Sequence, residues 1–270
     1  MAVLAKFSKT IYSDFRLHVA FTLFLVWLVA VWRFQTLNSF LYPLLAVFLM
    51  TVLDLGITMV RDKKLYFPSA SWVTGFLIGL IIDPSEPVWI IALAALVAFL
   101  SKQFIGAGLR QHIFNPAAFG IMATSLIFGV SVAWWGVAWE RLPLIILIPL
   151  MVRILWRMKR PWPPLAFLAV YYIYLITLIS PSDAFSTLMD GSVLLFALVM
   201  LPEPITSPAI GKFKYLFGIL VAILVIGLSY TKILEEVFLP ALLLGNLIGF
   251  LVLRFKKTFA ERQMSLSRPT

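Results

Sequence analysis

Two proline-containing segments of this sequence place polar side chains where a ligand could bind. The first is Phe114-Asn115-Pro116-Ala117, which follows the glycine-containing stretch Gly106-Ala107-Gly108. Asn115 can cap a helix whose first residue is Pro116, which is a structural role. Alternatively, a helix that begins here inside a membrane directs its free N–H groups and its positive dipole end toward an anionic or carbonyl-bearing ligand. The residues alone leave both interpretations open.

The second segment is Pro202-Glu203-Pro204-Ile205-Thr206-Ser207-Pro208. Its prolines interrupt any helix and leave backbone N–H and C=O groups unpaired, each at a cost of several kcal/mol in lipid. Side chains of Asn115, Thr206, Ser207 and Asn246 can satisfy part of this demand. The sequence therefore predicts a site between Asn115-Pro116 and Glu203–Ser207, with Asn246 as a further contact.

Three carboxylates are candidates for ion or proton binding: Asp54, Asp83 and Glu203. Asp54 lies within an apolar run, where a charge costs about 2.5–3.5 kcal/mol on insertion scales. It should face the protein interior, be paired or be protonated, unless it reaches the nearby cytoplasmic interface. No metal site is predicted, because the chain has no Cys and only two His, far apart in sequence.

The composition identifies the medium in which these residues act. The 270 residues are 62% hydrophobic and 13% charged, and the mean hydropathy is +1.00. Soluble domains are about 45–50% apolar and about 25% charged. The chain is therefore predicted to be an all-α integral membrane protein in contact with lipid, and a soluble enzyme, a secreted module or a nucleic-acid binder is excluded.

A helix needs about 20 apolar residues to cross the hydrocarbon. Ten apolar segments are predicted: Leu17–Arg33, Ser39–Val60, Ala70–Ile82, Val88–Gln103, Ala117–Trp135, Leu142–Trp156, Trp162–Ser180, Gly191–Leu201, Tyr215–Ser229 and Val237–Arg254. The third and eighth are short and end at acidic, proline-rich turns. We expect both to be half-helices that stop inside the bilayer and meet near a pseudo-twofold axis, the alternative being ordinary tilted spans.

Charge predicts the orientation of these segments. All of the 22 Lys and Arg residues except Arg33, Arg141 and Lys232 fall on one side. Positive charge collects in cytoplasmic loops, so both termini are predicted to be cytoplasmic in an inner-membrane, multi-pass protein. The polar start of the chain predicts no cleavable signal peptide. Five tryptophans near the segment ends are predicted to form interfacial belts: Trp134, Trp135, Trp139, Trp156 and Trp162.

Two sequence pairs predict an internal repeat. Gly75–Val88 matches Val193–Thr206 in character, and Phe114–Ala117 is echoed by Phe238–Ala241. Both pairs have nearly the same offset. One transmembrane domain, residues 1–270, would then contain two halves of five segments, about 1–140 and 141–270. An odd number of segments per half gives the halves opposite orientations, as in many transporters.

The motifs also resemble a known family. Pro202–Pro208 resembles the D-P-x-[ST]-[ST]-P element of the NqrB/RnfD family, membrane subunits of ion-translocating NADH:quinone and ferredoxin:NAD oxidoreductases. Phe114–Ala117 is similar to the family's F-N-P-A segment, and Gly211 lies at its downstream Gly. Glu235-Glu236 with Leu242–Asn246 is similar to its pattern in the last helix. The resemblance implies a ten-helix inverted repeat.

The resemblance also implies a flavin. The family's covalent FMN is carried by the Thr of an S-[GST]-A-T element in the outer loop after the fifth helix. Here that loop is Gly136–Arg141 and contains no Thr, so covalent FMN is not expected. We expect riboflavin or FMN to be held noncovalently, its ring edge against Asn115, Pro116, Glu203, Thr206, Ser207 and Asn246.

The leading hypothesis is a membrane subunit that holds a flavin and relays electrons across the membrane to other subunits of an electron-transport complex. Electron flow could be coupled to Na+ or H+ movement. Such a chain would be at most a redox subunit of an oxidoreductase, with lipid and sister subunits as partners. The alternative is a transporter or channel for a small polar solute, because inverted repeats are common in that class.

Overall fold

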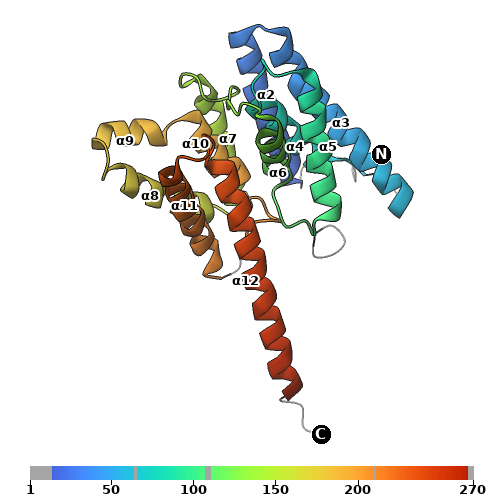
Figure 1. Ribbon diagram of the computed structural model, residues 1–270, viewed down its shortest axis with the longest axis vertical. Coiled ribbons are helices and arrows are strands. Elements are labelled where there is room, and N and C mark those ends of the chain that lie inside the picture. Colours follow the sequence, from blue (N-terminus) through green and yellow to red (C-terminus); the bar gives the residue numbers. More distant parts are fainter. Residues whose placement is uncertain (1–13, 64–65, 107–110, 209–210, 267–270) are drawn as a thin grey trace.

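The computed structural model describes residues 14–63, 66–106, 111–208 and 211–266, without the side chains of 62 and 256–266. It is built from helices (Figure 1). The first half holds α2 (Phe15–Phe34), α3 (Leu37–Asp62), α4 (Ser69–Ile81), α5 (Val88–Phe104) and α6 (Pro116–Phe128). The second half holds α7 (Leu142–Arg157), α8 (Trp162–Leu175), α9 (Pro181–Leu188), α10 (Gly191–Leu195), the π-helix η1 (Phe196–Met200), α11 (Phe213–Thr231) and α12 (Phe238–Leu266).

Four stretches in the described residues are long and apolar enough to cross a membrane: α2, Leu37–Arg61 of α3, α11, and Phe238–Phe255 of α12. A fifth is the pair formed by α9 and Gly191–Met200, which is bent by 54°. The fold is therefore that of a multi-pass helical membrane protein. Ten crossings, the inverted repeat and the single domain stay predictions.

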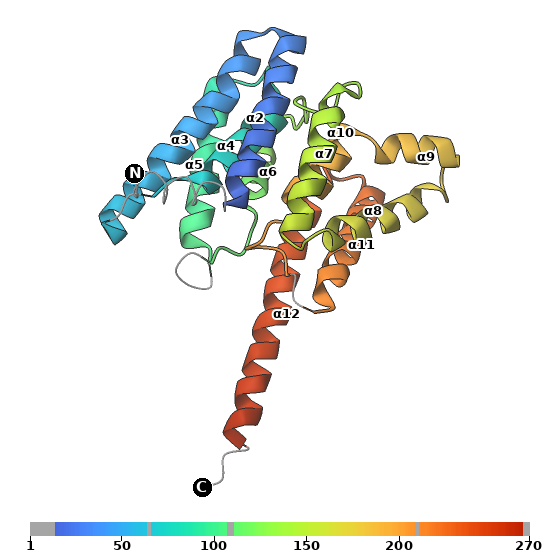
Figure 2. The ribbon, with the colours of Figure 1, turned by 180° about the vertical axis from the view of Figure 1, so that it is seen from behind.

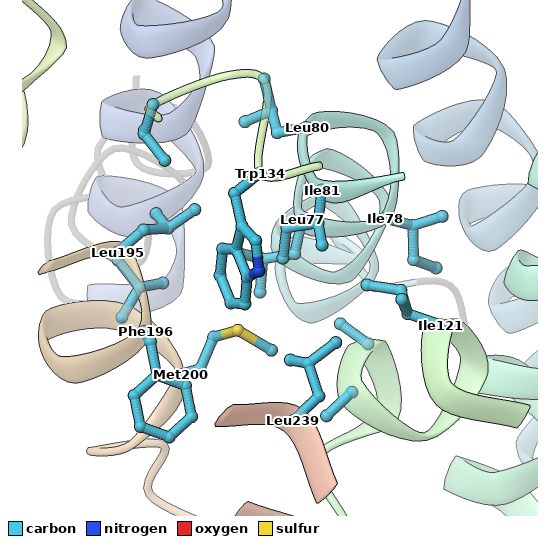
Figure 3. Close-up of a cluster of buried hydrophobic side chains, with 14 of the residues drawn as sticks. Leu77, Ile78, Leu80, Ile81, Ile121, Trp134, Leu195, Phe196, Met200 and Leu239 are labelled. Atoms are coloured by element: carbon cyan, nitrogen blue, oxygen red, sulfur yellow. The ribbon is translucent and has the colours of Figure 1, made fainter. Parts of the chain in front are cut away.

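The third and eighth predicted segments, which are short in the sequence, are also short helices in the structure. Helix α4 begins and ends one residue earlier than predicted, and its 13 residues rise only about 20 Å, less than the roughly 30 Å of hydrocarbon. The eighth segment is the α10–η1 run, Gly191–Met200. Side chains of α4, α10, η1 and the start of α12 share one apolar cluster around Trp134 (Figure 3). Whether either helix stops inside a bilayer stays a prediction.

The prediction of one continuous segment over Ala117–Trp135 is wrong for the C-terminal part of that range. Helix α6 ends at Phe128, and Gly129 closes it with a positive φ of 69°. The chain then turns back, and the N–H groups of Ala133 and Trp134 donate to the carbonyl of Ile81 at 2.9 and 3.0 Å. The apolar run after Gly129 thus covers the end of α4 and does not extend α6.

The prediction of an interfacial position is also wrong for two of the five tryptophans. Trp134 and Trp135 are buried, and their indole N–H groups have acceptors inside the protein. Trp134 donates to Glu236 Oε2 at 2.7 Å, and Trp135 donates to the carbonyl of Gly79 at 2.8 Å. Trp156 and Trp162 are exposed at helix ends, as a belt residue would be.

The halves meet along two helix pairs. Helix α2 packs on α7, and α6 packs on α12. Figure 2 shows α2 and α7 from the opposite side. The C-terminal part of α12 extends away from the other helices (Figure 1). The α6–α12 contact positions the polar groups considered below.

Close approach of α4 to α3 depends on two glycines spaced by four residues, Gly75 and Gly79. A Cβ at Gly79 would lie 2.4 Å from Pro43 Cα, and one at Gly75 would lie 2.5 Å from Val47 Cα. Small residues at this spacing allow helix backbones to touch in membranes. The contact is therefore made largely by backbone atoms.

We expect Gly79→Ala to lower the free energy of unfolding by about 1–3 kcal/mol, because the added methyl forces α3 and α4 apart. Thermal unfolding in detergent measures the change. Gly227→Ala on α11 is the matched control, because a Cβ there meets nothing within 4 Å. Equal midpoints for the two variants would contradict the α3–α4 contact.

Candidate functional site

Asn115 caps the start of α6, as the structural interpretation of this segment requires. The side-chain Oδ1 of Asn115 accepts a hydrogen bond from Ala118 N at 3.0 Å, and Pro116 occupies the first helical position. Asn115 is buried, with 3% of its surface exposed. The structural role of Asn115 is confirmed. Ala107 and Gly108 of the preceding stretch lie outside the described residues.

Asn246 joins this helix start to the broken segment of the second half. Its Oδ1 accepts from Asn115 N at 3.0 Å, and its Nδ2 donates to the carbonyl of Thr206 at 3.2 Å. Asn246 lies in the N-terminal third of α12 and is completely buried. One side-chain amide therefore satisfies two backbone groups from segments far apart in sequence, which would be costly to leave unpaired in lipid.

Glu203 extends these contacts toward the solvent. Its Oε2 accepts from the hydroxyl of Thr206 at 2.9 Å, and its Oε1 lies 3.4 Å from His112 Nε2. The His112 side chain is 5% exposed and that of Glu203 is 24% exposed. His112 comes from the segment between α5 and α6, so this pair also connects the two halves.

Arg160, in the turn between α7 and α8, holds the backbone of Pro202–Ser207. Its Nη1 donates to the carbonyls of Pro202, Glu203 and Ser207 at 3.1–3.3 Å and to the Ser207 hydroxyl at 2.7 Å. Its Nη2 donates to the carbonyl of Pro204 at 3.2 Å. Burial lowers the pKa of Arg160, and the nearby Glu203 carboxylate opposes that shift; an arginine nevertheless stays charged.

We call these residues the polar junction: His112, Asn115, Arg160, Glu203, Thr206, Ser207 and Asn246. The structure thus brings together the side chains predicted to form the site, beside Pro116. Sequence reasoning missed His112 and Arg160. Arg160 counted only as part of the cytoplasmic positive charge, and nothing in its local sequence shows that it folds back onto a segment more than 40 residues away.

Asp54 lies apart from the polar junction and is paired. It is 1% exposed. Its Oδ2 accepts from Tyr66, Ser71 and Lys102 at 2.6, 2.8 and 2.9 Å, and its Oδ1 accepts from Gln103 at 3.1 Å. Of the alternatives open from sequence, the structure places this carboxylate inside the protein with a cationic partner.

Asp83 lies at the other end of α4 and belongs to a turn. Its Oδ1 accepts from Ser85 N at 2.7 Å, and its own N–H donates to the carbonyl of Ser131 at 3.2 Å. Asp54 contacts Ser71 near the start of α4, so the length of that helix separates the two carboxylates. The three candidate ion-binding carboxylates therefore lie in three different places.

The residues expected to hold a noncovalent flavin do not fit that role in this conformation, because their polar groups bind one another. The Asn246 amide is used by Asn115 and Thr206, the Thr206 hydroxyl by Glu203, and the Ser207 hydroxyl by Arg160 and the Glu203 carbonyl. A groove of about 300 Å³ lies between Pro208, α11 and α12, but the side chains that line it are apolar. A flavin edge would have to break existing contacts.

Helical architecture, long apolar spans and buried polar contacts between the halves define an integral membrane protein of the multi-pass helical class. Residues 8–138 match the NQR2, RnfD, RnfE family. The resemblance to the NqrB/RnfD family is thereby confirmed over the first half of the chain. The second-half motifs, including Pro202–Pro208 and Leu242–Asn246, lie outside the matched residues.

Curated relatives agree with this family. A subunit of an ion-translocating oxidoreductase complex from Actinobacillus succinogenes is 29% identical over 94 residues, covering 34% of this chain and 26% of the relative. The corresponding protein of Cronobacter sakazakii is 31% identical over 110 residues, covering 38% and 31%. The equivalent component of a proton-translocating ferredoxin:NAD(+) oxidoreductase complex from Clostridium ljungdahlii is 28% identical over 86 residues, covering 32% and 26%. The matches span about a quarter to a third of the relatives' length.

Proposed function

We propose that this chain is a membrane subunit of an ion-translocating oxidoreductase complex and takes part in electron transport across the membrane. The observation that carries the proposal is the family match of residues 8–138, together with relatives that each belong to such a complex. The partners of the chain are then the other subunits of its complex and the surrounding lipid.

The proposed arrangement is ten crossings in an inverted repeat, with both termini on the cytoplasmic side of the inner membrane. The charge distribution supports the orientation. The short helices α4 and α10–η1, packed into one cluster between the halves, support the repeat. Reporter domains fused to each terminus should both be read from the cytoplasm, and an external signal from either one would overturn the orientation.

A noncovalent flavin, riboflavin or FMN, is part of the proposal. It would supply one-electron and two-electron redox chemistry that no side chain here provides. The missing Thr in the loop before α7 opposes covalent attachment. The contacts within the polar junction do not support a flavin at that place, so we derive no electron-transfer step through it.

The experiment is gentle purification from native membranes by an affinity tag, followed by mass spectrometry and a visible absorbance spectrum. We expect the chain to copurify with several other integral membrane subunits and a flavin that is released on denaturation. Addition of riboflavin or FMN should restore the spectrum of depleted protein. A chain that purifies alone and stays colourless after flavin addition would contradict the proposal and favour a polar-solute transporter.

A further inference from the structure

A groove of about 300 Å³ lies between α11 and α12, which pack side by side (Figure 1). Leu216, Ile219 and Ile223 line it from α11, and Ile248 and Val252 line it from α12. Both helices contain stretches long and apolar enough to cross a membrane. Leu216 and Ile223 are exposed, so the groove is open to the hydrocarbon of the bilayer, where no water is present to fill it.

The size and lining of the groove suit a hydrocarbon chain. Lining atoms without a neighbour lose dispersion contacts, and an acyl chain of the surrounding lipid restores them without any polar contact. A helix of another protein is about 10–12 Å across, so it would cover a groove of this volume and not enter it. A polar ring system would need hydrogen-bonding partners, and the side chains that line the groove are apolar.

A lysine continues the lining stripe to the surface of the membrane. Lys212 directly precedes α11, is exposed and already has a helical backbone. Lys212, Leu216, Ile219 and Ile223 are spaced by four, three and four residues, which places them on one face of the helix. Lys212 is therefore placed at the end of the groove, at the level of the lipid head groups.

The same end of the groove is positively charged. Arg254 follows the lining residue Val252 by two residues and is exposed, and the start of α11 contributes its positive dipole end. The sequence has no acidic residue between Glu203 and Glu235 or between Glu236 and Glu261. The two helices therefore carry no carboxylate of their own to neutralise this charge, which favours a negative head group.

We propose that the groove between α11 and α12 is a binding site for an anionic phospholipid, such as phosphatidylglycerol. One acyl chain occupies the groove and Lys212 binds the phosphate, while Arg254 adds to the positive charge around it. The lipid contacts both helices at once, so it stabilises their packing. This site goes beyond the proposed function, because it requires two membrane-spanning helices and no electron transfer.

The test is the thermal unfolding midpoint of the purified full chain in detergent. Dioleoyl phosphatidylglycerol is titrated against dioleoyl phosphatidylcholine, which has the same acyl chains. A ligand that binds only the folded state raises the midpoint, and we expect a larger rise with phosphatidylglycerol. In Lys212→Met, half of that rise should need about fivefold more lipid, the factor for one basic residue at a membrane surface. Inorganic phosphate should give no rise, because it has no acyl chain.

Lys214→Met is the matched control for the charge. It removes the same charge two residues away, and the Lys214 ammonium lies 5.6 and 4.9 Å from the ring centroids of Trp162 and Tyr215. It should respond to phosphatidylglycerol as wild type does. Equal responses of Lys212→Met and Lys214→Met would overturn the proposal, as would a rise with inorganic phosphate as large as that with the lipid.

Ile223→Trp tests the groove itself, because the larger side chain fills it from an exposed position. The rise with phosphatidylglycerol should be lost in this variant and kept in Ile145→Trp, whose site is exposed on α7. If Ile223→Trp does not fold, Leu216→Trp replaces it, since Leu216 is also exposed and lines the groove. A folded groove-filling variant that responds as wild type does would overturn the proposal.

Discussion

Arg160→Ala is expected to lower the free energy of unfolding by about 3 kcal/mol and to loosen the segment Pro202–Ser207. Hydrogen bonds from a charged donor are worth about 1.5–3 kcal/mol each, although several on one side chain do not add fully. Arg160 supplies such bonds to four carbonyls and one hydroxyl. Thermal unfolding measures the stability, and protection of the 202–208 amides in hydrogen exchange measures the loosening.

Arg160→Lys should recover little of this loss, because a single ammonium cannot reproduce the planar fork of donors. Arg153→Ala is the control, since Arg153 is exposed on α7 and removes the same charge nearby. A Lys variant as stable as wild type would show that charge alone matters, which contradicts the hydrogen-bonding role.

Asn246→Leu is expected to cost about 2–6 kcal/mol. The variant leaves two buried backbone groups without partners, Asn115 N–H and Thr206 C=O, and each costs about 1–3 kcal/mol. The side chains are similar in size, so packing changes little. The loss should be measured as a fall in the thermal midpoint in detergent.

Asn115→Leu provides a graded comparison. It removes the cap of α6 but keeps the backbone N–H that donates to Asn246, so it should cost only about 0.5–2 kcal/mol. Leu244→Ala, at a partly exposed position on α12, should cost less than Asn246→Leu. An Asn246→Leu protein as stable as wild type would show that α12 does not join the two segments as described.

The residue types at the site could be predicted because lipid leaves few choices. Prolines within apolar runs free backbone groups, and those groups need polar partners nearby. This reasoning indicated Asn115, Thr206, Ser207 and Asn246 together, and the structure joins them. It could not show that these residues form hydrogen bonds with one another and not with a ligand. Those hydrogen bonds depend on how α6 and α12 approach each other, which no local sequence pattern encodes.

Two other features could not be read from the chain. Lys102 and Arg160 belong to a general excess of positive charge on one side, and sequence does not separate a charge that faces water from one that folds inward. The end of α6 was missed because Val130–Trp135 is as apolar as a membrane span. A segment buried against α4 and a segment buried in lipid both need apolar side chains, so composition alone does not distinguish them.

The central claim is that this chain takes part in moving electrons across a membrane, and proteoliposomes test it directly. The chain, with whatever subunits copurify, is reconstituted into vesicles that enclose ferricyanide, and dithionite is added outside. We expect enclosed ferricyanide to be reduced faster in these vesicles than in protein-free vesicles. Reduction no faster than in protein-free vesicles, alongside faster entry of small polar solutes, would contradict it.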